Sequence, residues 1–206
     1  MSTDPLYLYV KLSELGTRVR QVLASTWPLQ QDAYHQLWTR LSQAKSSFIP
    51  EACKSGPTVS DWSLERRTAK WLYQTLLMRL HWLFFCAASQ GAPGMSAEPA
   101  TVAAAALALE SSQRLSKEIV EDMEQEWVPN QVSTCTAVKV LRQVASVSIF
   151  SFNWDLGPEW ASNWQCHIYK IIRLLGKMKK WSRQAGAIQG EVWSKYSEKW
   201  RACPGL

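Results

Sequence analysis

Apolar residues recur every three or four positions along most of this chain, which is the spacing that places them on one face of an α-helix. No segment shows the strict alternation of apolar and polar residues that is typical of a half-buried strand. The pattern therefore predicts an all-α fold, arranged as a single layered array of about seven helices. We expect these helices at about 5–24, 31–47, 61–88, 98–126, 134–152, 159–180 and 183–201.

The third of these helices carries the longest apolar stretch, between residues 71 and 88. Arg79 and His81 interrupt it, and a bilayer-spanning helix needs about 20 predominantly apolar residues. We therefore expect a buried central helix and no membrane span. Its inward stripe is predicted to contain Leu64, Thr68, Leu72, Tyr73, Leu76, Leu80 and Phe84. We expect it to share one interior with a matching stripe on the sixth helix, formed by Trp160, Trp164 and Ile168.

Turn-forming and capping residues mark the breaks between the helices. Residues 89–97 combine glycine with proline and predict a flexible loop. Ser60 or Asp61 is expected to cap the third helix, and Thr134 the fifth. The length of 206 residues suits one large domain or two small ones, and we predict a single all-helical domain over 1–206.

The cysteines and histidines are too scattered to predict a metal site. Neighbouring cysteines are at least about thirty residues apart, which is neither a disulfide framework nor the spacing of zinc ligands. None of the three histidines has a second histidine or a cysteine at ligand spacing along its helix. The first residues lack the basic flank and apolar core of a signal peptide. We expect no metal, no cofactor and no secretion.

Charge is unevenly distributed along the chain, whose net charge is +6. The acidic stretch around Glu118, Glu121 and Asp122 could bind Mg²⁺, but a second carboxylate motif on another helix is missing, which argues against an enzyme. The C-terminal third is basic, and its cations alternate with apolar residues at helical spacing, which favours a solvated helix face over direct DNA contact. This basic face consists of Lys170, Arg173, Lys177, Lys180 and Arg183.

Aromatic residues offer one further candidate site. The twelve tryptophans are expected to fill the core, and the functional alternative is an aromatic-lined pocket for a small-molecule effector. Ligand pockets are mostly apolar with a few polar groups. The candidates for such a pocket are Tyr73, Arg79, His81, Trp82, Trp160 and Trp164.

The spacing in the third helix, Tyr73 followed eight residues later by His81 within Leu80-His81, resembles the regulatory domain of fungal zinc-cluster transcription factors, the middle homology region. Trp82 and Leu83 stand where that family usually has Arg-Pro. Residues 33–41 resemble its short helix before a variable loop, and 101–106 its alanine-rich segment without the usual cysteine. Residues 163–185 resemble its late helix.

The resemblance implies a regulatory domain that controls a transcription factor through intramolecular or protein contacts, in the nucleus or the cytoplasm, with or without a small ligand. The family's six-cysteine DNA-binding module is absent, so we expect no sequence-specific DNA binding by this chain alone. Its expected partners are other regulatory proteins or the DNA-binding part of a longer chain. The alternatives are a helical enzyme of small-molecule metabolism and a plain protein-interaction scaffold.

Overall fold

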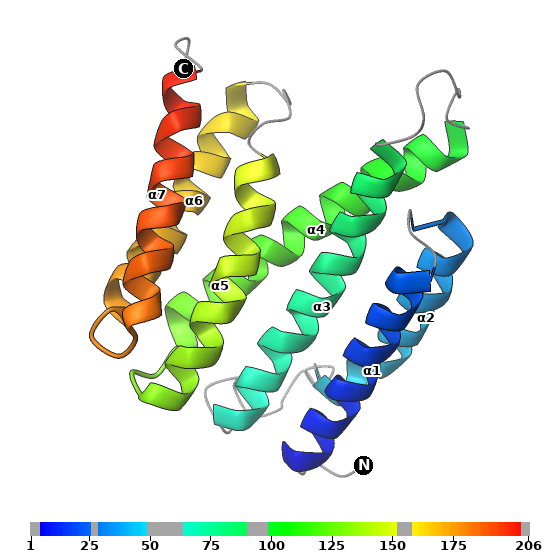
Figure 1. Ribbon diagram of the computed structural model, residues 1–206, viewed down its shortest axis with the longest axis horizontal. Coiled ribbons are helices and arrows are strands. Elements are labelled where there is room, and N and C mark those ends of the chain that lie inside the picture. Colours follow the sequence, from blue (N-terminus) through cyan, green and yellow to red (C-terminus); the bar gives the residue numbers. More distant parts are fainter. Residues whose placement is uncertain (1–4, 26–28, 49–63, 90–98, 152–157, 203–206) are drawn as a thin grey trace, which may run out of the picture. The chain divides into compact units, whose positions relative to one another are not determined.

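The prediction of an all-α chain with about seven helices is confirmed. A computed structural model describes residues 5–25, 29–48, 64–89, 99–151 and 158–202. These ranges form seven α-helices and no strand (Figure 1). None of these helices combines the length and the apolar content that crossing a lipid bilayer requires. The helices are α1 (Pro5–Ser25), α2 (Gln31–Phe48), α3 (Leu64–Ser89), α4 (Pro99–Glu126), α5 (Gln131–Ser151), α6 (Pro158–Met178) and α7 (Arg183–Ala202).

Two helix boundaries differ from the prediction for local reasons. Helix α5 begins at Gln131, so the predicted cap at Thr134 is wrong. Asn130 is the cap instead, because its side-chain oxygen accepts the backbone N–H of Ser133 at 2.8 Å. Helix α6 ends at Met178, whose carbonyl accepts the N–H groups of Trp181 and Ser182. The predicted cap at Ser60 or Asp61 and the loop at 89–97, except Ser89, lie outside the described residues.

The chain divides into two compact units, Met1–Leu115 and Ser116–Leu206. The boundary falls inside α4, so residues 99–115 of this helix belong to the first unit and 116–126 to the second. A single domain over 1–206 stays a prediction. The common interior proposed for α3 and α6 also stays a prediction, because these helices belong to different units.

In the first unit, α1, α2 and α3 pack against one another and alternate in direction (Figure 1). Stacked rings join α2 to α3, with Phe48 on Tyr73 at 4.8 Å and Tyr34 on Phe84 at 4.1 Å between ring centroids. The predicted α3 stripe is partly right. Its members Thr68, Tyr73, Leu80 and Phe84 are buried, whereas Leu64, Leu72 and Leu76 are only partly so.

The burial of α3 extends around much of its circumference. Trp71, Met78 and Phe85 lie off the predicted stripe and are buried as well. This explains why a single stripe read from helical spacing could not locate the core-facing side. Alanines at positions 105 and 108 of α4 also join this core, where small side chains let helices approach closely.

In the second unit, α5, α6 and α7 pack against one another. The predicted α6 stripe is confirmed at Trp164 and Ile168, which are buried, while the side chain of Trp160 lies outside the described residues. Gly176 leaves room for Gln189 of α7, whose side-chain amide donates to the carbonyl of Ile172 at 2.9 Å. A Cβ atom at position 176 would lie 2.9 Å from that amide nitrogen. A glycine is therefore what lets Gln189 bridge α6 and α7.

Candidate functional site

His81 of α3 is a buried histidine that has a hydrogen-bond partner. Its Nδ1 lies 2.7 Å from the hydroxyl of Tyr34 on α2. Burial, and then the positive charge of Arg114, lower the pKa of His81 to about 4. Burial also raises the pKa of Tyr34 to about 12. Both side chains are therefore neutral at pH 7, and the pair is suited to holding α2 and α3 together.

Tyr73 is bonded in the same α2–α3 interface. Its hydroxyl donates to the carbonyl of Leu41 at 2.7 Å, and burial raises its pKa to about 12. Of the other pocket candidates, Arg79 is exposed and Trp82 is half-buried, 5.9 Å from the ring of Phe85. The structure thus brings Tyr73 and His81 into one packed interface and leaves Arg79 outside it.

The remaining two pocket candidates belong to the second unit. Trp164 is buried there, and the side chain of Trp160 is outside the described residues. An effector pocket formed by all six residues therefore stays a prediction. Within the first unit, the hydrogen bonds of Tyr73 and His81 serve packing, since the Tyr73 hydroxyl and His81 Nδ1 each already have a protein partner.

The second unit contains a buried polar cluster of its own. The hydroxyl of Ser116 lies 2.8 Å from His167 Nε2 and 3.0 Å from the hydroxyl of Ser148. Burial, and then the positive charges of Lys117 and Lys170, lower the pKa of His167 to about 3. Neutral histidine beside serine is the arrangement of an activated nucleophile. Ser116, however, is fully buried, so a substrate could not reach it without opening the core.

The acidic end of α4 pairs with the basic face of α6. Lys170 Nζ lies 4.0 Å from Glu121 and 3.8 Å from Glu124, and Arg173 binds Glu124 directly. Glu121, considered above as a Mg²⁺ ligand, therefore serves with Glu124 as an ion-pair partner. Within the described residues, no group of three or more His, Cys, Asp or Glu could hold a metal ion. Four residues of the predicted basic face are exposed, Arg173, Lys177, Lys180 and Arg183, and the last three of these are not paired by the α4 carboxylates.

We expect this reduced basic face to bind DNA weakly and without sequence preference. Three cations would give a slope of log K against log salt no steeper than about −3, at roughly 0.9 per phosphate contact. Glu124→Gln should steepen the slope, because it releases Arg173 and leaves Lys170 with Glu121 alone. Fluorescence anisotropy with a labelled duplex over a salt series measures the slope. Glu110→Gln is the control, since Glu110 is exposed and the charge change is the same. A sequence-selective complex at physiological salt would contradict this prediction.

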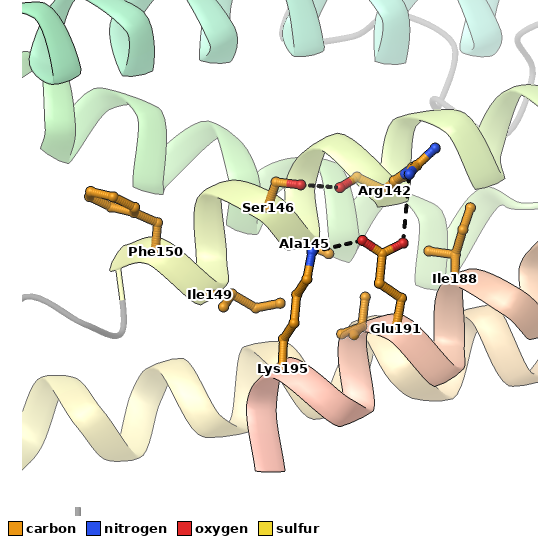
Figure 2. Close-up of a pocket in the computed structure, with 9 residues that line it drawn as sticks. Arg142, Ala145, Ser146, Ile149, Phe150, Ile188, Glu191 and Lys195 are labelled. Carbon is orange, nitrogen blue, oxygen red and sulfur yellow. Dashed lines mark hydrogen bonds and ion pairs between the residues drawn. The ribbon is translucent and has the colours of Figure 1, made fainter. Parts of the chain in front are cut away.

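An open groove lies between α5 and α7 in the second unit (Figure 2). Its floor is apolar and buried, and is formed by Ala145, Ile149, Ile188 and Val192. Its rim carries exposed charged and polar side chains, and Phe150 lies at one end. On this rim Glu191 accepts a hydrogen bond from Lys195 at 2.7 Å and lies 3.6 Å from Arg142.

The groove continues along α5 toward Lys139. A second hollow there shares Arg142, Ile188 and Glu191 with the first, so the two form one continuous surface. The volume is about 200 Å³ at the Phe150 end and about 330 Å³ at the Lys139 end. The first value is below, and the second slightly above, the lower limit of roughly 300 Å³ for small-molecule pockets. Both hollows are open to solvent, so the surface suits side chains of another polypeptide better than a small ligand that must be buried on most sides.

Comparisons with protein-family models, with curated proteins and with solved structures found no match. Sequence reasoning missed the groove, although one signal was present. Glu191 and Lys195 are four residues apart and so face one side of a helix. Nothing in the sequence showed that α5 would lie beside that side.

Proposed function

We propose that this chain is a non-catalytic regulatory domain of the fungal transcription-factor type, which acts through protein contacts at the α5–α7 groove. The observation that carries the proposal is a contrast between interior and surface. The polar groups of Tyr34, Tyr73, His81, Ser116 and His167 are hydrogen-bonded inside packed cores. The groove, by contrast, is open and presents an apolar floor with a charged rim, which is the composition of a protein-binding surface.

The transcription-factor type is supported by the resemblance of residues 73–85 and 163–185 to the family's helices. In this chain Tyr73 and His81 both bond to α2. Their spacing therefore has a structural reason, because two residues about two turns apart on one side of a helix can hold the same neighbouring helix. A nuclear location, and partners among other regulatory proteins, are part of the same proposal.

The alternative of a helical enzyme has one favourable observation, the contact between Ser116 and His167. The burial of Ser116 argues against it. Ser116 and Ser148 are fully buried, and catalysis requires the nucleophile to meet its substrate at about 3 Å. The cluster is better explained as a satisfied polar network that fixes α4, α5 and α6 relative to one another within the second unit.

A reporter assay tests the proposed function. The complete chain is placed between a heterologous DNA-binding module and an activation segment, and transcription is measured in yeast against the same fusion without the chain. A regulatory domain should change the output severalfold at equal protein level, checked by immunoblotting. The double variant Lys177→Glu/Lys180→Glu is the control, because these residues are exposed and do not line the groove. An output that is the same with and without the chain would refute the regulatory function.

A further inference from the structure

We infer that the α5–α7 groove binds an acidic amphipathic helix from a protein partner, with the apolar side chains of that helix on Ile149, Ile188 and Val192. The inference rests on the proposed function and names the chemistry of the partner at the same site. Segments that alternate acidic and apolar residues are a recognised class of regulatory sequence. An amphipathic helix in a hydrophobic groove is one of the recurring modes of peptide recognition.

The dimensions of the groove favour a helix of two to three turns. Its lining residues on α5 run from Lys139 to Phe150, which corresponds to roughly 16 Å at 1.5 Å per residue. On α7 the lining runs from Gln184 to Lys195, a similar length. A bound helix with apolar residues at i, i+3 or i+4, and i+7 spans roughly 10 Å between its outer anchors. Such a helix can therefore place three anchors along the floor.

The charge of the rim favours acidic residues on the partner. The rim carries three cations, Lys139, Arg142 and Lys195, and one carboxylate, Glu191. The hydrogen bond and the charge of Lys195 lower the pKa of Glu191, as does the charge of Arg142. Glu191 therefore stays ionised at neutral pH and holds Arg142 and Lys195 at the rim. The rim keeps a net positive charge, and a complementary partner is negative.

The apolar floor argues against nucleic acid as the occupant. A phosphate backbone would satisfy the cations but would not cover the apolar surface that Ile149, Ile188 and Val192 still present in the groove. The floor lacks exposed aromatic side chains on which bases could stack, apart from Phe150 at one end. A helix that carries both carboxylates and apolar anchors satisfies rim and floor together.

The direct test uses a synthetic peptide and the complete chain. The probe is a fluorescein-labelled peptide of about 15 residues, long enough for three helical turns and their flanks, with Leu at i, i+3 and i+7 and Glu or Asp elsewhere. We expect saturable binding in fluorescence anisotropy. A scrambled peptide of the same composition, which loses the apolar spacing, should bind about 10-fold more weakly or not at all.

Two charge-reversed variants locate the site. Lys139→Glu/Arg142→Glu should weaken peptide binding by about 10-fold or more. Lys177→Glu/Lys180→Glu, which makes the same charge change on exposed residues outside the groove, should leave binding nearly unchanged. Circular dichroism spectra that match the wild type would show that both variants are folded.

Three outcomes would overturn the inference. These are equal binding of the scrambled peptide, equal losses in the two variants, or displacement of the peptide by an unlabelled DNA duplex at equal charge concentration. The result also stays separate from the reporter assay. A reporter effect that survives Lys139→Glu/Arg142→Glu would support the regulatory function but show that the groove is not needed for it. Peptide binding without a reporter effect would support the groove as a binding site but refute the regulatory function.

Discussion

Lowering the pH from 7 to 4.5 should strongly destabilise this protein, because its two buried histidines must take up protons that the folded state resists. The pKa of His81 is lowered to about 4 and that of His167 to about 3, against about 6.5 in an unfolded chain. Between these values the unfolded state binds more protons than the folded state. Stability is therefore fully present above about pH 6.5 and is lost as the pH falls below it.

The size of the effect makes it measurable. At pH 4.5 each histidine should cost on the order of 2 kcal/mol, so the pair removes a large share of a typical stability of about 5–15 kcal/mol. Urea denaturation followed by circular dichroism at several pH values gives the slope, which should approach about 2.7 kcal/mol per pH unit below pH 6, or about 1.4 per histidine.

Matched substitutions show how much each histidine contributes to the dependence of stability on pH. Asn at position 81 keeps a polar atom near the place of Nδ1, and Gln at position 167 keeps one near Nε2. His81→Asn and His167→Gln should each remove about half of the acid-dependent slope, even if they lower stability at pH 7. His35→Gln is the control, because His35 is exposed. A slope that is unchanged in both test variants would show that other groups cause the acid sensitivity.

Leu80→Ala should lower the free energy of unfolding by about 2–5 kcal/mol, the range for truncation of a fully buried leucine. Leu80 has no exposed surface and belongs to the core of the first unit. Alanine is an excellent helix former, so the loss would come from packing and not from the backbone of α3. Urea denaturation at pH 7 measures it.

The neighbouring residue supplies the control for this substitution. Arg79 is exposed on the same helix, and Arg79→Ala should change stability by no more than about 0.5 kcal/mol. Two adjacent positions would then differ severalfold in effect because they face opposite environments. Equal effects at 79 and 80 would be incompatible with the buried face of α3 described above.

The helices were predictable because each is long and its apolar spacing is sustained. Their ends were harder, since Asn130 and Thr134 are both good caps and only the hydrogen bond to Ser133 distinguishes them. The burial of Leu80, Trp164 and Ile168 followed from spacing alone. The burial of Trp71 and Met78 did not, because spacing shows one face of a helix and α3 is covered on more than one.

The candidate sites were harder to predict than the helix ends, because each site depends on residues that are distant in sequence. Ser116 and His167 meet across 51 positions, and Tyr34 and His81 across 47. Spacing could flag His81 as a histidine in an apolar stripe, but not the hydroxyl that would satisfy it. Lys170, Arg173 and Lys177 of the predicted basic face lie on α6, whereas Lys180 follows the end of that helix and Arg183 begins α7. The pairing of Lys170 and Arg173 with Glu121 and Glu124 could be predicted only by knowing that α4 lies beside α6.

The contact between Gly176 and Gln189 makes the value of one residue depend on the other. Alanine in place of glycine inside a helix usually gains about 0.5–1 kcal/mol. At position 176 it would push the Gln189 amide away from the carbonyl of Ile172 and forfeit a hydrogen bond worth about 1 kcal/mol. The two terms nearly cancel, so the substitution is close to neutral in this protein. It becomes favourable when residue 189 has a side chain too short to reach the carbonyl of Ile172. The effect of a substitution at position 176 therefore depends on residue 189, and the order in which the two positions change decides whether an intermediate variant loses stability.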